Sequence, residues 1–215
     1  MRILVVVILW MKAPAREREC HDESGAASYY TKALLSEEEP MARISLIEVQ
    51  QASPEVKEIY DKLLRGKIGN IQKAMAHRPE ALKTFLAFYS SVGRSLDRKL
   101  YELIYIRVSM INGCHYCLQH HLASSKRVGL APEDWNALKQ ADYTRFDEKA
   151  QSALPYAEKL TRTSSKITDS DVAALKKQFS DAEIVDLHLL VGLANLTNRF
   201  TAPLGLELEI LEEKI

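Results

Sequence analysis

Apolar residues recur along most of this chain with the spacing of amphipathic helices. From about residue 53 onward they return every three or four positions, as Leu82, Phe85, Leu86 and Tyr89 do. No stretch reads as a convincing alternating strand. The pattern therefore predicts an all-α fold, a compact bundle of about eight helices.

Residues that begin and end helices divide the chain into these segments. Ser53-Pro54 is typical of a cap followed by a first-turn proline, and Gly129 is typical of a helix end. Ser180 and Glu183 have the spacing of a capping box. The expected helices cover about 54–64, 71–77, 79–92, 100–111, 114–128, 132–141 and 147–162, one that follows Thr168, and 181–199.

One stretch, residues 100–130, concentrates the candidate chemistry. It holds two of the three cysteines and three of the six histidines. We expect its two helices to be separated by Asn112-Gly113, with Asn112 as the N-cap of the second helix. Because the unpaired N–H groups at a helix start stabilise negative charge, that position favours a thiolate at Cys114 or Cys117.

The Cys-x-x-Cys spacing is the usual layout of a reversible dithiol. At about 100° per residue, Cys114, Cys117 and His121 lie within about 60° of one another on one helix face. A zinc half-site is one alternative, but a structural zinc ion takes about four ligands, and only His115, His120 or a distant residue remains. Two buried structural cysteines are the other alternative.

An acidic residue that precedes the two cysteines belongs to the same sequence motif. Glu102 is followed after eleven residues by Cys114-x-x-Cys117 and, three residues later, by His121. This run resembles the signature of the alkylhydroperoxidase D-like branch of the carboxymuconolactone decarboxylase family. The hexapeptide NGCHYC and the late helix that ends in NRF are similar to the peroxidase-related members. The resemblance covers about residues 41–208 and implies the helical fold of that family.

The resemblance also implies roles for these residues. Cys117 is the expected peroxidatic thiol, which a hydroperoxide oxidises to a sulfenic acid, and Cys114 then forms a disulfide with it. His121 and Glu102 are the expected proton-handling pair. A thiol at i−3 can capture a sulfenic acid before further oxidation, and a histidine at i+4 is near enough to take the thiol proton.

The implied activity is that of a cofactor-independent thiol peroxidase. Its substrates are hydrogen peroxide or organic hydroperoxides, and its reductant is an external lipoyl or thioredoxin-like dithiol. The resemblance implies a homo-oligomer as well, which agrees with long helices that carry few charges. No metal or organic cofactor is expected.

One position departs from the family pattern. The residue before the second cysteine is often histidine, and here it is Tyr116. Tyr116 can donate a hydrogen bond, but its unperturbed pKa of about 10 makes it a poor base. His120 lies nearer to Cys117 around the helix than His115 does, at about 60° against about 160°. His120 is therefore the first substitute to test, with a plain surface position as the alternative.

Glu102 has a structural alternative of its own. It interrupts a run of large apolar residues, 100–106, so we expect it to be buried. A buried carboxylate needs a partner or a raised pKa. Arg98 at i−4 could pair with it for purely structural reasons, whereas the motif favours the functional role.

Two other functions are open at this point. One is decarboxylation of a muconolactone-like substrate, the activity that names the family, although that chemistry has no use for a redox pair. The other is a non-enzymatic redox-sensing helical module, whose disulfide reports oxidation without turnover.

Composition and charge narrow the choice of partners and location. The chain has 215 residues with 29 basic and 29 acidic side chains, a formal net charge of zero. This balance gives no reason to expect a nucleic acid or an acidic membrane as a partner. Three cysteines do not make a disulfide framework. A dithiol enzyme usually works in a reducing compartment, so we expect a cytoplasmic location.

Residues 1–40 differ from the rest and are expected to form an N-terminal extension to a helical domain at 41–215. Residues 3–11 are apolar but fewer than the about 20 that span a bilayer. They weakly resemble a signal peptide, whereas a start placed upstream of the true one is the preferred explanation. The polar segment that follows is expected to be disordered, with Cys20 and His21 incidental.

Overall fold

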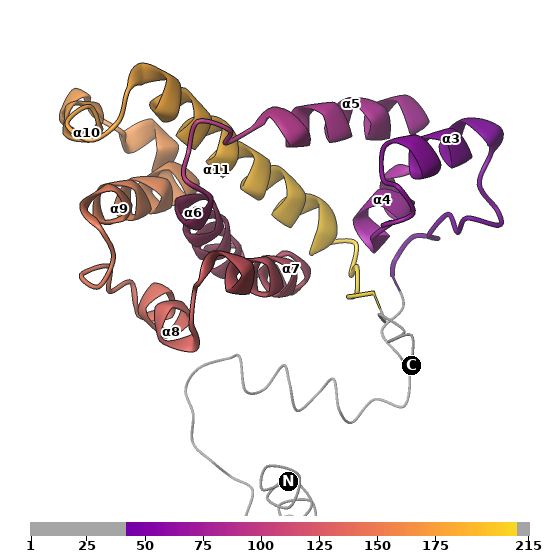
Figure 1. Cartoon of the computed structure of the whole chain (residues 1–215), viewed down its shortest axis with the longest axis horizontal. Helices are drawn as coiled ribbons and strands as arrows, with labels where there is room; N and C mark the ends of the chain where they lie inside the picture. Colours follow the sequence, from indigo (N-terminus) through magenta and orange to yellow (C-terminus); the bar gives the residue numbers. More distant parts are fainter. Residues whose placement is uncertain (1–41, 210–215) are drawn as a thin grey trace, which may run out of the picture. The chain divides into compact units, whose positions relative to one another are not determined.

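A computed structural model of the chain describes residues 42–209, all of which are helical or lie in connections between helices (Figure 1). This part of the chain contains nine α-helices and no strand, which confirms the predicted all-α fold. The predictions for residues 1–40, including Cys20 and His21, lie outside the described residues. In chain order the helices are α3 (Pro54–Lys62), α4 (Asn70–Met75), α5 (Pro79–Ser91), α6 (Arg98–Ile111), α7 (His115–Ser125), α8 (Pro132–Gln140), α9 (Glu148–Thr163), α10 (Asp169–Leu175) and α11 (Asp181–Thr201), with short 3-10 helices at Lys126–Val128 and Ser164–Lys166.

Most helix boundaries follow from the capping residues. The side chains of Ser53, Asp147, Thr168 and Ser180 each accept a hydrogen bond from a backbone N–H in the first turn of the next helix. Gly129 ends the 3-10 helix after α7 in the left-handed region, with φ 78°. These starts and this stop confirm the predictions made from the residue types.

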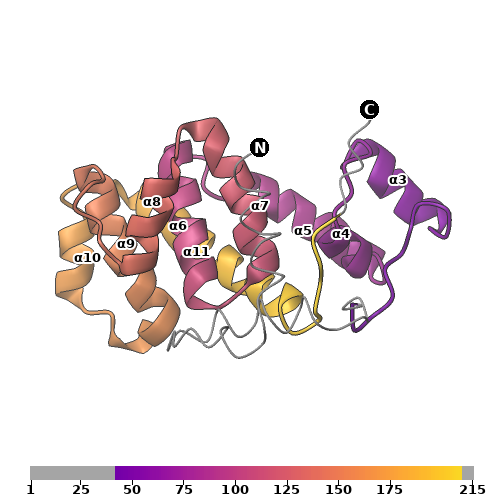
Figure 2. The ribbon, with the colours of Figure 1, turned by 90° about the horizontal axis from the view of Figure 1, so that it is seen from below.

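Helix α6 is the centre of the larger core. Every residue from 100 to 109 is buried, because α6 is apolar on almost all sides and is covered by α7, α9 and α11 (Figures 1 and 2). The buried guanidinium of Arg107 is compensated by Glu158, whose Oε1 lies 2.9 Å from Arg107 Nε, and by the carbonyl of Leu138 at 2.9 Å. The central helix therefore carries the predicted acid, Glu102, into the interior.

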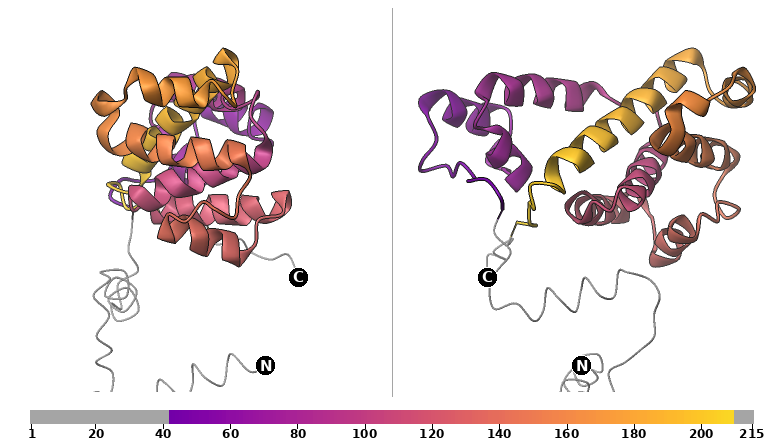
Figure 3. Two further views of the ribbon diagram at one scale, coloured as in Figure 1. Left: turned by 90° about the vertical axis from the view of Figure 1, so that its left-hand side faces the viewer. Right: turned by 180° about the vertical axis from the view of Figure 1, so that it is seen from behind.

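Helices α3, α4 and α5 lie on one side of α11, and α6 to α10 lie on the other (Figure 3). The first group has a smaller apolar cluster of its own, formed by Ala52, Val56, Ile59, Tyr60, Ala76 and Leu82. Helix α5 buries only Leu82, although it also carries phenylalanine, leucine and tyrosine side chains. Helix α5 therefore retains an apolar face that the described residues leave largely uncovered.

The stretch after α11 runs back to the start of α4 (Figure 2). The N–H of Arg43 donates to the carbonyl of Leu204 at 2.8 Å, and Asn70 Nδ2 donates to the carbonyl of Glu207 at 2.9 Å. These bonds bring Glu209 beside α4 and α7. No helix between residues 42 and 209 has the length and apolar character that crossing a bilayer requires.

Candidate functional site

Both thiols lie at the start of α7, but the cap differs from the prediction. Cys114 is itself the N-cap, in an extended conformation, and its Sγ accepts a hydrogen bond from the N–H of Cys117 at 3.2 Å. Gly113 precedes it with φ 64°, a left-handed conformation that suits glycine. The helix start therefore holds one sulfur directly against the backbone of the other cysteine.

The prediction that Asn112 caps α7 is wrong. Asn112 is instead the C-cap of α6, and its side-chain amide is held by α11. Its Nδ2 donates to Asn195 Oδ1 at 3.0 Å and to Asn198 Oδ1 at 2.9 Å. Because these tertiary bonds occupy the side chain, it joins α6 to α11 and does not cap α7.

The two sulfurs share one hydroxyl neighbour from α11. Cys114 and Cys117 are free thiols with exposed fractions of 1% and 4%. Thr201 Oγ1 lies 3.0 Å from the Sγ of Cys114 and 3.2 Å from the Sγ of Cys117. Its single hydrogen can be donated to a sulfur or to the carbonyl of Thr197, which is 2.9 Å away.

The hydrogen bond between the two thiols separates their pKa values. It lowers the pKa of Cys117, and hydrogen bonds from Thr201, Asn198 and Thr197 lower it further, against the opposing effect of burial. The same bond with Cys117, together with burial, raises the pKa of Cys114. Cys117 is therefore the thiol that ionises first, and only a thiolate is an effective nucleophile.

Glu102 and His121 form a buried pair between α6 and α7. Glu102 Oε2 lies 2.7 Å from His121 Nδ1, and the two residues have exposed fractions of 3% and 8%. Burial lowers the pKa of His121, although Glu102 opposes this effect. Arg98 Nη2 lies 3.6 Å from the other carboxyl oxygen. Glu102 therefore contacts both Arg98, its possible structural partner, and His121, its partner in the motif.

The imidazole ring of His121 is also held in place by stacking on an aromatic ring. The ring of Tyr105 lies nearly parallel to it, with centroids 3.6 Å apart, and Tyr105 Oη lies 2.6 Å from Thr197 Oγ1. If His121 Nδ1 carries the hydrogen toward Glu102, its Nε2 is left as the acceptor. The pair can therefore accept one proton at a fixed position.

Cys117 and His121 line one cavity of about 280 Å³, together with Tyr105, Tyr116 and His120. The structure thus gathers the four predicted site residues, Cys114, Cys117, His121 and Glu102, around the start of α7. Within residues 42–209, no group of three or more histidine, cysteine or acidic residues is arranged to hold a metal ion.

Tyr116 and His120 both contact the carboxylate of Glu209, a residue that the sequence did not indicate. Tyr116 Oη donates to Glu209 Oε1 at 2.7 Å, and His120 Nε2 lies 2.9 Å from Glu209 Oε2. Glu209 follows α7 by more than eighty residues, in the segment after α11, so no local pattern connects it with the site. Thr201 was missed as well, although Thr197 and Thr201 place two hydroxyl groups on one face of an apolar helix.

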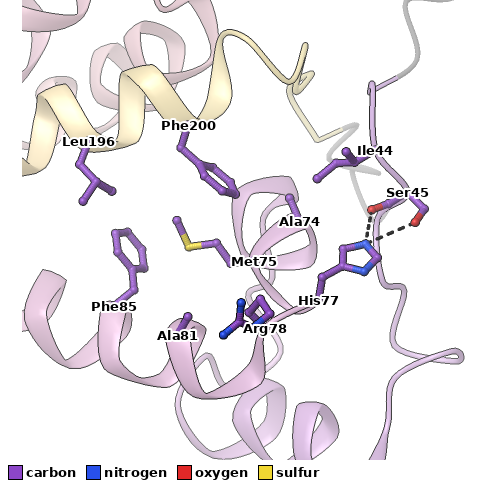
Figure 4. A pocket seen from close by; sticks show the side chains of 10 residues that line it. All are labelled: Ile44, Ser45, Ala74, Met75, His77, Arg78, Ala81, Phe85, Leu196 and Phe200. Atoms are coloured by element: carbon purple, nitrogen blue, oxygen red, sulfur yellow. Dashed lines mark hydrogen bonds between the residues drawn. The ribbon is translucent and has the colours of Figure 1, made fainter.

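A second cavity of about 690 Å³ lies between α4, α5 and α11 (Figure 4). Its walls are mainly apolar and include Met75, Leu196 and Phe200. His77 lies at its edge, where Nε2 contacts the carbonyl of Ser45 at 2.8 Å. No thiol and no acid lines this cavity, which separates it chemically from the cavity that holds Cys117.

The comparisons with known proteins agree with this fold. Residues 79–159 match the carboxymuconolactone decarboxylase family, and this segment contains Glu102, Cys114, Cys117 and His121. An uncharacterized protein of Bacillus subtilis, YdfG, is 29% identical over 135 residues, which cover 59% of this chain and 88% of that protein.

Two solved structures have the same arrangement of helices. An uncharacterized peroxidase-related protein from Silicibacter is 26% identical, with a TM-score of 0.66 over 82% of this chain and 96% of its own. A peroxidase-related protein from Ralstonia eutropha, described as an alkylhydroperoxidase AhpD core, is 22% identical, with a TM-score of 0.69 over 80% of this chain and 94% of its own. The resemblance inferred from the sequence is confirmed, and at 22% identity the second structure supports the fold alone.

Proposed function

Since residues 79–159 match the carboxymuconolactone decarboxylase family, we propose that this protein is a thiol peroxidase that uses Cys117 and Cys114. Its substrates are hydrogen peroxide or organic hydroperoxides. The observation that carries this proposal is the grouping of the site's side chains. Cys117 and His121 line one cavity, Glu102 Oε2 lies 2.7 Å from His121 Nδ1, and the Sγ of Cys114 lies 3.2 Å from the backbone nitrogen of Cys117.

The cycle begins when the Cys117 thiolate attacks the terminal oxygen of the hydroperoxide. An S–O bond forms and the O–O bond breaks, so the sulfur loses two electrons and the peroxide gains them. The products are a sulfenic acid on Cys117 and an alcohol, or water when the substrate is hydrogen peroxide. The thiol of Cys114 then displaces water from the sulfenic acid and forms the disulfide.

His121 and Glu102 prepare the nucleophile in this proposal. Burial keeps the imidazole of His121 unprotonated at neutral pH, so its free nitrogen can accept the proton of Cys117. The contact with Glu102 at 2.7 Å fixes the ring and stabilises the imidazolium that results. Glu102 therefore positions the base and does not itself react.

An external dithiol reduces the disulfide back to two thiols. The two sulfurs are almost fully buried, and the cavity beside Cys117 has a volume of about 280 Å³. These dimensions suit a slender lipoyl arm, and a thioredoxin-like protein is the alternative donor. Because the cycle requires continuous reduction, we place it in the cytoplasm.

A peroxide-consumption assay with a panel of dithiols tests this function. The wild type consumes peroxide catalytically with at least one dithiol, Cys117→Ser falls to the background rate, and Cys114→Ser loses turnover after one oxidation. Cys20→Ser is the matched control and keeps the wild-type rate. Full activity of Cys117→Ser contradicts the proposal, and disulfide formation without turnover under every dithiol indicates the redox-sensing alternative.

A further inference from the structure

A second imidazole–carboxylate pair borders the cavity that contains Cys117. His120 Nε2 lies 2.9 Å from Glu209 Oε2, and His120 lines the cavity together with Cys117 and His121. The side chain of His120 is 42% exposed and that of Glu209 is 17% exposed. The cavity is therefore flanked by two histidines, each held by a different carboxyl group.

The tail of the chain holds Glu209 as a carboxylate. Burial opposes its ionisation, but the close contact with His120 and the hydrogen bonds from Tyr116 and the N–H of Asn70 outweigh burial and lower the pKa of Glu209 to about 2. Glu209 is thus a fixed negative charge next to the His120 ring, with 2.9 Å between Glu209 Oε2 and His120 Nε2.

The two pairs differ in their access to water. His121 is buried, and burial lowers its pKa, which suits a proton acceptor. The exposed part of the His120 ring can regain a proton from solvent between turnovers. The two adjacent imidazoles are therefore suited to opposite directions of proton transfer.

Tyr116 and Lys67 also line this cavity and carry protons that could be donated. Burial raises the pKa of Tyr116, and its hydroxyl hydrogen is already donated to Glu209 at 2.7 Å, so it is a poor acid. The Tyr116 ring lies 4.4 Å from the His120 ring and helps to fix it. Lys67 lines the cavity from the loop before α4 and is exposed.

We propose that His120 is the general acid that protonates the leaving alkoxide, with Glu209 as the residue that positions it. This inference rests on the proposed peroxidase function. As the Cys117 sulfur takes the terminal oxygen, the O–O bond breaks and leaves RO⁻. Nδ1–H of the His120 imidazolium gives its proton to RO⁻, which departs as ROH, and the neutral imidazole regains a proton from water.

The dependence of the rate on the leaving group tests this assignment. The probes are tert-butyl hydroperoxide, which leaves as an alkoxide and needs a proton, and peracetic acid, which leaves as acetate and needs none. The reduced wild type, His120→Gln, Glu209→Gln and Lys67→Gln are each mixed with both oxidants, and the rate of Cys117 oxidation is followed in a single turnover. His188→Gln, an exposed histidine of α11 that contacts Tyr156, is the matched control.

His120→Gln is expected to lower the rate with tert-butyl hydroperoxide by on the order of 100-fold, while the rate with peracetic acid changes by less than about threefold. Glu209→Gln shows the same selectivity with a smaller loss, and His188→Gln changes neither rate. Circular dichroism confirms that each variant is folded.

Three results overturn the assignment. An equal loss with both oxidants means that His120 has only a structural role, and no loss with either means that it donates no proton. A selective loss in Lys67→Gln in place of His120→Gln assigns the proton to the lysine. Failure of the wild type to react with either oxidant contradicts the peroxidase function itself, and so is distinguished from these three results.

Discussion

Thr201 is the residue of α11 whose hydroxyl group contacts both cysteine sulfurs. Its hydroxyl lies within 3.2 Å of both sulfurs, and it also reaches the carbonyl of Thr197. When Cys117 loses its proton, a hydrogen bond from Thr201 to the sulfur stabilises the thiolate more than the thiol. A buried hydroxyl therefore contributes to the low pKa of Cys117.

Replacing Thr201 with valine is expected to raise the pKa of Cys117. A hydrogen bond to a charged group contributes about 1.5–3 kcal/mol, so the rise is about one to two pKa units. The pH dependence of Cys117 alkylation measures it, with a midpoint in the wild type below the ordinary value of about 8.5. Thr84→Val removes a similar hydroxyl that bonds Glu80 on α5, and it leaves the midpoint unchanged.

A wild-type midpoint at or above the ordinary value contradicts the assignment of Cys117 as the activated thiol. An unchanged midpoint in Thr201→Val removes the role given to that hydroxyl alone.

The residues that could be predicted are those whose relation is local. Cys114, Cys117 and His121 lie within eight positions on one helix, so the helical period places them together without knowledge of the fold. Thr201 and Glu209 reach the site from positions more than eighty residues away. Only the packing of α11 and of the tail brings them there. The spacing of Thr197 and Thr201 places two hydroxyl groups on one helix face, but it does not indicate which helix that face contacts.

At the scale of elements, the candidate site lies where α6 and α7 pack against each other. Glu102 is carried by α6 and His121 by α7, and their contact of 2.7 Å lies inside the core. The cost of burying a carboxyl group is offset by this contact and by Arg98. The pair of Glu102 and His121 therefore joins the two helices, so stability and the proposed chemistry depend on the same groups.

The free energy of unfolding is expected to fall as the pH decreases below about 6.5. Burial lowers the pKa of His121 in the folded state, so in this range the unfolded chain binds more protons. Stability therefore rises with pH across this range. His188, whose pKa burial also lowers, adds to the same slope.

Urea unfolding at a series of pH values checks this dependence. His121→Gln reduces the slope, and His188→Gln reduces it separately. An identical slope in the wild type and in His121→Gln means that the folded state does not keep His121 unprotonated.

Element boundaries could be predicted wherever a capping side chain has no tertiary partner. Ser180 and Glu183 bond each other's backbone at the start of α11, as their spacing indicates. Asn112 has equally favourable chemistry for a cap, but its amide is held by Asn195 and Asn198. Residue preference is thus overridden where tertiary hydrogen bonds compete for the same side chain.

At the scale of the whole molecule, the exposed apolar side chains of α5 and α11 favour a homo-oligomer. These side chains are Phe88 and Tyr89 on α5 and Val185, Leu189 and Leu196 on α11. The three on α11 are spaced by four and seven residues, so they lie along one side of the helix. Two helix faces of this kind would be covered if a second copy of the chain packed against both.

Light scattering at micromolar concentration is expected to give a mass that is a multiple of the chain mass. Leu196→Glu places a charge on the α11 face and lowers that mass, whereas Leu63→Glu, at an exposed position after α3, leaves it unchanged. A monomeric wild type contradicts the expected oligomer.

The central claim is tested most directly by mixing the reduced protein with one equivalent of peroxide in the absence of any reductant. The account predicts that peroxide is lost in step with the appearance of a disulfide that joins Cys114 to Cys117, identified by peptide mass. In Cys114→Ser the reaction stops at a sulfenic acid on Cys117, which dimedone traps. A sulfenic acid on Cys114, or peroxide consumption while both thiols remain reduced, contradicts the account.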